Sequence, residues 1–195
     1  TQKNPSVAHF RQALAIDERR RLFRPRLWIE PQEFVVNPFD LAGRLQQSVK
    51  QVWFAGSHGD IGGGRLETES GLSKIPLLWM AEEAIGVGLP VHTQSMNRIA
   101  RGQAYPGDTR LHAAPDPAAD LYRSDKGGWQ IPEWLPKRAA RREWPDRKPA
   151  AGVYLPRSEP RFIPAQSMVH SSVKDRMAIV PDYRPVNLPA NPVWV

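Results

Sequence analysis

A short apolar run that ends in a glycine-dense turn is the feature that most constrains the fold of this chain. Residues 52–64 read VWFAGSHGDIGGG. Four consecutive apolar residues before glycine predict a buried strand, Val52–Ala55, that closes in a tight turn. A helix is predicted within about one loop length. Strand, turn and helix in this order indicate an α/β fold, in which ligands and catalytic groups gather where strands end.

Four further elements are expected in residues 1–100. The run at residues 8–22 carries apolar residues on one approximate helical face, and residues 73–85 are broadly apolar between serines and Gly86. We therefore expect a helix over residues 8–22, a short strand over Leu27–Ile29, a helix over Ala42–Val49 and a helix over residues 73–85 that packs on the sheet.

The second half of the chain has a different composition. Fourteen of the twenty prolines follow residue 100, and three tryptophans lie among charged residues there. Because proline at this density interrupts regular elements, we expect a Pro/Trp-rich irregular C-terminal extension with one short helix over Val169–Met177. Residues 1–100 would then carry the histidine loop, and residues 101–195 would wrap over the same domain.

Composition excludes several kinds of site. The chain has no cysteine and no histidine pair with helical metal-ligand spacing, so neither a metal nor a cofactor is expected. A net charge of +7 permits attraction to the phosphate of nucleic acid or of anionic lipid. Trp129, Trp134 and Trp144 could stack on bases. No nucleic-acid-reading motif accompanies them, so nucleic acid is not an expected partner.

The residues of the glycine-dense turn suit acid–base chemistry. His58 would lie at the rim of a sheet, and an imidazole there can act as a general base. Asp60 could hold the loop by accepting backbone N–H groups, while Gly62, Gly63 and Gly64 let the backbone turn tightly. The same residues also fit a purely structural turn whose histidine and aspartate satisfy local hydrogen bonds. The residues alone leave both interpretations open.

Several blocks resemble one protein family. Residues 51–64, QVWFAGSHGDIGGG, are similar to the signature QVWFPGVHSDVGGGY of a family of α/β-hydrolase domains that includes the type VI secretion phospholipase effectors. Four more blocks resemble that family in the same order: His9–Arg20, Leu77–Met80 with Gly88–Leu89, Val169–Val173, and Tyr183–Pro189. The departures of the turn from the signature include Ala55, Ser57, Gly59 and Arg65, but the turn keeps its histidine, aspartate and glycines.

The resemblance implies the C-terminal part of an α/β-hydrolase-like fold with a Ser-Asp-His triad that cleaves esters, in characterised members those of phospholipids. His58 matches the triad histidine. Because this fold orders its triad serine, aspartate, histidine, the nucleophile and the aspartate are expected upstream of Thr1. The chain alone is therefore expected to be inactive. The alternative is a non-catalytic interaction module of a secreted effector.

Ser57 offers a competing nucleophile, because AGSHG fits a variant of the nucleophile elbow. An elbow serine needs a helix that begins at once, and the three glycines argue against this, so Ser57 is the less favoured assignment. Among the other histidines, His9 is expected to have a structural role at a helix start. His170 is expected to cap or brace the start of another helix. His92 and His112 lie in polar loops and suggest no specific role.

The expected partners follow from the same resemblance. They are a phospholipid or other ester substrate, a secretion-spike or immunity protein, and a membrane surface contacted peripherally. No signal peptide opens the sequence and no window is apolar enough for a membrane span. We therefore expect a protein that is cytoplasmic in the producing cell, is secreted if at all without a signal peptide, and is not transmembrane.

Overall fold

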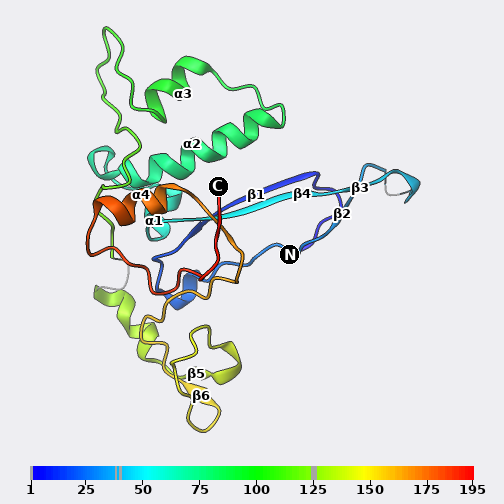
Figure 1. Ribbon diagram of the computed structural model, residues 1–195, viewed down its shortest axis with the longest axis vertical. Helices are drawn as coiled ribbons and strands as arrows, with labels where there is room; N and C mark the ends of the chain where they lie inside the picture. The colour runs from blue at the N-terminus through cyan, green and yellow to red at the C-terminus, as the bar shows by residue number, and fades with distance from the viewer. Residues whose placement is uncertain (1, 38, 40, 124–126) are drawn as a thin grey trace.

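The computed structural model describes residues 2–37, 39, 41–123 and 127–195. Its centre is a sheet of four parallel strands with helices packed against it, an α/β arrangement (Figure 1). In spatial order the strands are β1 (His9–Ala15), β4 (Ser48–Phe54), β7 (Met168–Val169) and β8 (Val193–Trp194). β1 and β4 pair over their full lengths and form the longest ladder. β1 lies at one edge of the sheet.

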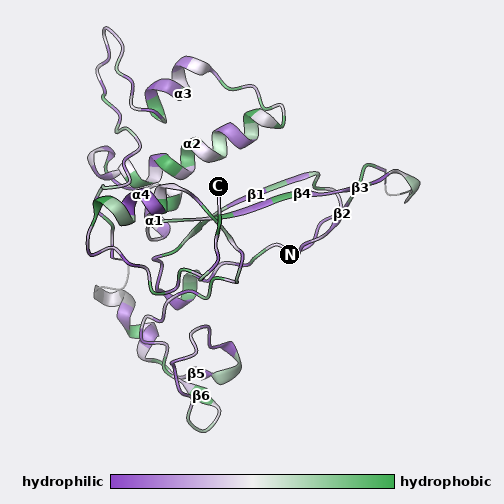
Figure 2. Ribbon diagram, viewed as in Figure 1, coloured by the Kyte–Doolittle hydropathy of each residue, from purple (hydrophilic) through white to green (hydrophobic). Residues whose placement is uncertain are grey.

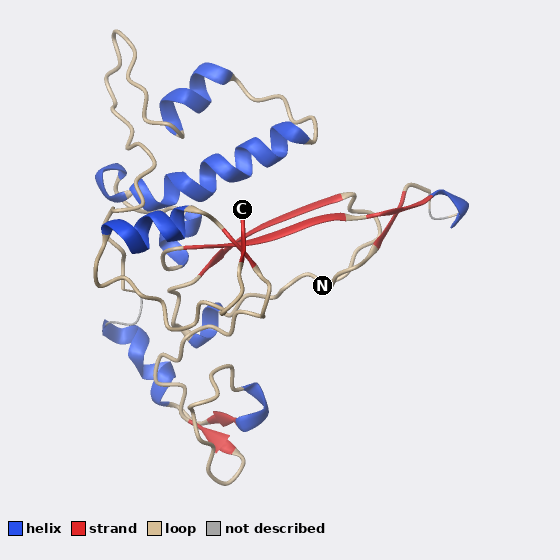
Figure 3. Cartoon of the chain, viewed as in Figure 1, coloured by secondary structure: helices blue, strands red, loops and turns tan. Residues whose placement is uncertain are grey.

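The remaining elements surround this sheet (Figure 3). The α-helices are α1 (His58–Gly62), α2 (Gly71–Gly86), α3 (Thr93–Ile99) and α4 (Ser172–Ile179). Short 3-10 helices are η1 (Arg21–Phe23), η2 (Leu41–Gly43), η3 (Glu67–Glu69), η4 (Gly127–Trp134) and η5 (Ala139–Arg141). Two antiparallel pairs are β2 (Glu33–Val35) with β3 (Arg44–Gln46), and β5 (Lys137–Arg138) with β6 (Val153–Tyr154). None of the helices in the described residues is long and apolar enough to cross a bilayer.

The core has two parts, one on each face of the sheet. Side chains alternate along a strand, so β4 sends Val52 and Phe54 to one face and Trp53 to the other. The first pair packs against α2, and Trp53 packs against a cluster that includes α4. Figure 2 shows β4 with both hydrophilic and hydrophobic residues, and only its last three residues, Val52, Trp53 and Phe54, are fully buried. The predicted strand Val52–Ala55 is therefore confirmed as the end of β4.

Residues after 100 contribute to the same sheet and core. β7 and β8 extend the sheet beyond β4, and Ile163, Val169 and Val173 are buried together with Leu14 and Trp53. The predicted short helix near Val169–Met177 is found as α4, which begins three residues later because Val169 belongs to β7. The predicted helix over residues 73–85 is confirmed as α2.

The predicted helix over residues 8–22 is wrong, because His9–Ala15 forms strand β1 and η1 follows it. The residues favour helix locally, but their pairing with β4 outweighs that preference. In the folded chain burial alternates at the end of β1: Leu14 and Ile16 are buried, and Ala15 between them is half-buried.

Two other predicted elements near β4 are also wrong. Residues expected to form the helix Ala42–Val49 form η2, β3 and the start of β4, because Arg44–Gln46 pairs with β2 as a hairpin. Leu27–Ile29 does not form a strand. Its Trp28 N–H donates instead to the side-chain Oε1 of Gln51, at 2.6 Å, so this extended segment is held by a side chain rather than by a ladder.

Candidate active site

The site lies where β1 and β4 end side by side. Ala15 pairs with Phe54, and beyond the ladder the Ile16 N–H donates to the Phe54 carbonyl at 3.0 Å. One residue further, the Asp17 N–H donates to the Gly56 carbonyl at 3.0 Å. The carboxyl ends of parallel strands point the same way, so the loop after β1 and the histidine loop after β4 lie against one another.

Glu18 anchors the backbone of His58. The Glu18 side chain is 2% exposed, and its Oε2 accepts the backbone N–H of His58 at 3.1 Å. The same carboxylate accepts the Arg20 N–H at 2.8 Å and pairs with the Arg20 guanidinium at 2.9 Å. A buried carboxylate with these partners is a charge-assisted anchor, so it fixes the first residue of α1 relative to the loop after β1.

Asp17 anchors the turn before His58. Its Oδ2 accepts the Gly56 N–H at 2.8 Å and the Tyr183 hydroxyl at 2.8 Å. Burial raises the pKa of Asp17, although both hydrogen bonds act in the opposite direction. Gly56 has a φ of 125°, and a Cβ there would lie 2.6 Å from the Asp60 Cβ, so only glycine fits this turn.

Ser57 is buried and faces Asp60 rather than a cavity. Its Oγ donates to Asp60 Oδ2 at 2.9 Å, and its backbone N–H donates to the same oxygen at 2.8 Å. Tyr122 N–H is a third donor to that oxygen, at 3.2 Å. The expectation that no helix begins at once after Ser57 is wrong: α1 starts at His58, because the glycines lie at the end of α1 and after it instead of before it. Ser57 has an ordinary extended φ of −81°.

His58 is exposed at the start of α1 and lines a cavity of about 350 Å³. Its ring centroid lies 5.0 Å from that of Phe23, at an interplanar angle of 54°. In the described ranges no side chain or backbone group hydrogen-bonds to the imidazole. The imidazole is therefore free to exchange a proton with a bound group. The cavity is also lined by Glu18, Phe23, Arg24, Ile61 and Arg161.

Gly62 is the last residue of α1, and Gly63 and Gly64 follow it before η3. Gly63 and Gly64 have φ values of 80° and 96°. A Cβ at any of the three would meet nothing within 4 Å. They line a separate cavity of about 550 Å³ between β1 and α2, so the backbone of these glycines is open to a ligand.

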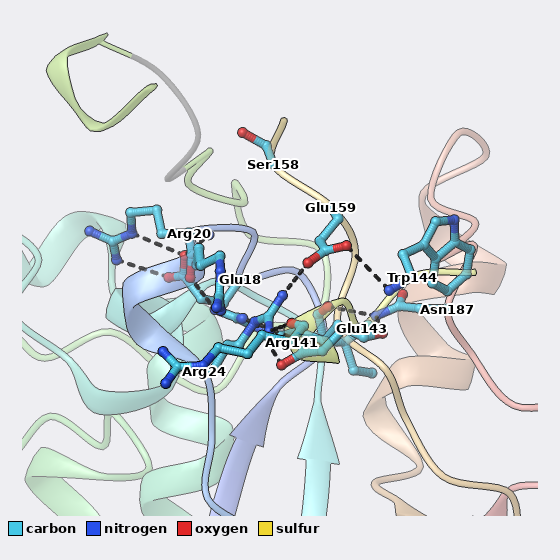
Figure 4. Close-up of polar contacts among 12 residues, drawn as sticks. Glu18, Arg20, Arg24, Arg141, Glu143, Trp144, Ser158, Glu159 and Asn187 are labelled. Carbon is cyan, nitrogen blue, oxygen red and sulfur yellow. Dashed lines mark hydrogen bonds and ion pairs between the residues drawn. The ribbon is translucent and has the colours of Figure 1, made fainter. Parts of the chain in front are cut away.

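A buried ionic network supports one wall of the His58 cavity, because Arg24 belongs to the network and lines the cavity. Figure 4 shows the polar contacts of this network. Arg24 pairs with Glu159 and donates to the Arg141 carbonyl, and the Tyr154 hydroxyl donates to Glu159 at 2.8 Å. Glu159 also accepts the Trp144 N–H at 3.2 Å. These contacts join residues 141–159 to the segment after β1.

Arg161 completes that wall. It is 2% exposed, donates to the Arg20 carbonyl and lies 3.8 Å from Glu143. Burial lowers the pKa of Arg161, while the nearby glutamates act in the opposite direction. Buried charges this close to a cavity hold its shape only while every partner is present.

The other histidines have structural contacts. His170 Nδ1 accepts the Ser172 N–H at 3.2 Å at the start of α4, as a brace would. His92 Nδ1 accepts the Ser95 N–H at 3.3 Å at the start of α3, and His112 lies 3.3 Å from Glu67. His9 begins a strand, which corrects the expectation of a helix start. In the part of the chain that is described, no group of three or more potential ligands could hold a metal.

Sequence reasoning missed Asp17 and Glu18, because both were assigned to a helix. Their place at the end of a strand follows from the pairing of β1 with β4, so no local sequence signal marks them. Arg24, Glu159 and Arg161 were also missed. They come from segments far apart in sequence, and no local pattern marks their convergence.

A known protein family matches the part of the chain that contains the His58 turn. Residues 1–83 match the model of the family described as "T6SS, Phospholipase effector Tle1-like, catalytic domain". The resemblance to type VI phospholipase effectors is confirmed over this span. It includes β1, β4, the His58 turn and most of α2. No curated protein and no solved structure matches the chain. The Tle1-like match supports a lipase-like function in general, and a phospholipase effector acts on phospholipid substrates.

Proposed function

We propose that the chain supplies His58 as the general base of a serine ester hydrolase that acts on phospholipids. The observation that carries the proposal is the exposed imidazole in a cavity at the end of β4, on a backbone anchored by the buried Glu18. The Tle1-like match over residues 1–83 supports the lipid substrate. An α/β-hydrolase-like fold is part of the same proposal.

The proposed chemistry is acyl transfer. The imidazole of His58 takes the proton of a serine hydroxyl while the serine oxygen attacks the ester carbonyl carbon. The resulting imidazolium gives that proton to the departing alcohol, which leaves an acyl-serine. Water then attacks the acyl-serine with His58 as base again, and the proton returns to the serine as the fatty acid leaves. Rigid placement of the imidazole is what the anchored loop provides.

We place the nucleophilic serine and the triad aspartate outside these 195 residues, upstream of Thr1 or on a companion chain. Ser57 is a poor nucleophile because its Oγ is buried and donates to Asp60. Asp60 acts in this proposal as a loop support, and Gly62, Gly63 and Gly64 permit close approach of substrate. Asp17 and Glu18 bind the loop backbone and act as positioning residues.

The alternative function is a non-catalytic module that docks to a secretion-spike or immunity protein. Exposed apolar residues on α2 and just beyond it favour a partner surface there: Leu77, Ile85, Val87 and Leu89.

Labelling with a serine-reactive fluorophosphonate, together with a p-nitrophenyl ester assay, separates these assignments. We expect the 195-residue chain to show neither labelling nor turnover. Labelling that disappears in the Ser57→Ala variant would instead assign the nucleophile to Ser57 and contradict the proposal. In an active protein that contains these residues, His58→Ala should abolish turnover, whereas a non-catalytic module would show no turnover in any context.

A further inference from the structure

Consecutive residues of the loop after β1 line two different cavities. Glu18 lines the cavity that contains His58, and Asp17 lines another of about 370 Å³. This Asp17 cavity is also lined by Leu121, by the end of α4 and by the residues that follow α4. It therefore lies next to the histidine loop but does not contain the imidazole.

Arginine dominates the charge of this second cavity. Its lining includes Arg19, Arg123, Arg176 and Arg184, against two carboxylates, Asp17 and Asp182. Within the described residues, no carboxylate lies within ion-pair distance of Arg19, Arg176 or Arg184. Asp17 interacts electrostatically with Arg176 and Arg19 without forming an ion pair with either, so four arginines against two carboxylates leave the lining with an excess of positive charge.

Arg176 is the fixed part of that charge. It is 4% exposed, and its Nη1 donates to the carbonyls of Pro117 at 2.6 Å and Ala119 at 2.7 Å. Its guanidinium lies 4.9 Å from the centre of the Tyr183 ring, and its Nε has no hydrogen-bond partner among the described residues. Neutral carbonyls and an aromatic ring orient a guanidinium without cancelling its charge.

Arg184 and Arg19 are the more accessible part. Arg184 is exposed, and its Nη1 donates to the carbonyls of Met177 at 2.8 Å and Tyr183 at 2.7 Å. Arg19 is half-buried, and its Nη1 donates to the Ser158 carbonyl across a long 3.5 Å. Both guanidiniums therefore have donors left for a ligand, since each carries five N–H groups.

We propose that this arginine-lined cavity binds a phosphate group, as a site separate from the His58 cavity. One arginine fork satisfies a carboxylate, whereas several arginines from different segments suit the larger number of oxygens on phosphate. Asp17 does not block such a ligand, because its Oδ2 is occupied by the Gly56 N–H and the Tyr183 hydroxyl. The phosphate can belong to a lipid headgroup or to a soluble phosphate compound. Only the lipid source depends on the proposed function.

Isothermal titration of the full chain with inorganic phosphate at about 0.15 M salt tests the site. We expect saturable binding that weakens roughly tenfold or more in the double variant Arg19→Gln with Arg184→Gln. The matched control is Arg138→Gln with Arg142→Gln, which removes the same charge from the densest basic run. The control should bind as the unaltered chain does.

Arg184 holds two carbonyls, so its substitution can loosen the fold. The single variant Arg19→Gln avoids this difficulty and should weaken phosphate binding several-fold with an unchanged thermal unfolding midpoint. Absence of saturable phosphate binding, or equal weakening by both double variants, would overturn the proposal. Phosphate binding should also persist in His58→Ala, so failure of the catalytic assignment would not be mistaken for failure of this site.

Vesicles distinguish the two sources of phosphate. If the ligand is a headgroup, vesicles of phosphatidylcholine with phosphatidylglycerol will retain the chain and inorganic phosphate will displace it. If it is a soluble compound, phosphate will titrate the cavity while those vesicles retain no protein. Both outcomes support a phosphate site. Retention that is equal for the Arg19/Arg184 and Arg138/Arg142 variants and insensitive to free phosphate would contradict it.

Discussion

The carboxylate of Glu18 accepts the backbone N–H of His58 across 3.1 Å, although the two residues are forty positions apart in sequence. The contact joins the ends of two adjacent parallel strands, β1 and β4. Since Glu18 is buried and paired with Arg20, the position of the histidine depends on an ionic cluster rather than on the turn alone. This dependence can be tested independently of catalysis.

Removal of the Glu18 carboxylate should destabilise the protein. Glu18→Ala removes the carboxylate that accepts hydrogen bonds from the Arg20 guanidinium and from the backbone N–H of His58. We expect a loss of about 2–4 kcal/mol in the free energy of unfolding, measured by urea titration. Glu69→Ala, on the exposed η3, is the control and should change it by less than about 0.5 kcal/mol. Equal effects would show that the anchor is unimportant.

Gly56 should not tolerate a side chain. Gly56→Ala would place a Cβ 2.6 Å from that of Asp60 at a φ of 125°, so we expect destabilisation by about 2–4 kcal/mol. Gly62→Ala is the matched control within the same turn, because a Cβ there meets nothing within 4 Å. It should be close to neutral. Thermal unfolding of both variants would decide, and a neutral Gly56→Ala would contradict the described turn.

His170 should make stability depend on pH. Burial lowers the pKa of His170, with Asp175 and Glu82 acting in the opposite direction. The unfolded chain therefore takes up this proton more readily than the folded one, so stability is full above the unfolded pKa of about 6.5 and falls as the pH decreases below it. His170→Asn keeps a cap for α4 and should flatten the decline. His92 is exposed, so His92→Asn should leave the decline unchanged. Identical plots of unfolding free energy against pH for the unaltered chain and both variants would show that His170 does not cause the decline.

The Arg24–Glu159 pair should matter far more than a surface pair. Glu159→Ala removes the buried carboxylate that pairs with Arg24 and accepts the Tyr154 hydroxyl. Arg24 keeps its ion pair with Glu143 at 2.8 Å and the Tyr154 hydroxyl keeps the Arg141 carbonyl at 3.0 Å, so we expect a cost of about 2–4 kcal/mol in unfolding free energy. Glu33→Ala breaks the exposed pair with Arg44 and should cost less than about 1 kcal/mol. Chemical denaturation of the two variants compares them directly. Similar costs would mean that the wall of the His58 cavity is not held by this network.

The sequence predicted the parts of the fold that local patterns encode. The apolar end of β4, the long apolar α2 and the short α4 each carry their own signal, and all three are present. β1 was missed because its residues favour helix in isolation, and only the ladder with β4 makes it a strand. A single sequence carries no direct record of that pairing.

The candidate site also combines residues that a local motif marks with residues that only the tertiary fold brings together. His58, Asp60 and the glycines share one short motif and could be selected from the sequence. Glu18, Arg24 and Arg161 reach the same cavity only through tertiary packing, and the misassigned helix concealed the first of them. The position of α1 directly after Ser57 also depended on where the glycines fall relative to the helix, which spacing alone did not determine.

The catalytic role proposed for His58 is that of the general base. Its most direct test is fatty-acid release from phospholipid vesicles by an active protein that contains these residues, compared with its His58→Ala and His92→Ala variants. We predict a loss of about 10³-fold or more for His58→Ala, with an unchanged unfolding midpoint, and full activity for His92→Ala. Full activity in a folded His58→Ala variant would contradict this role.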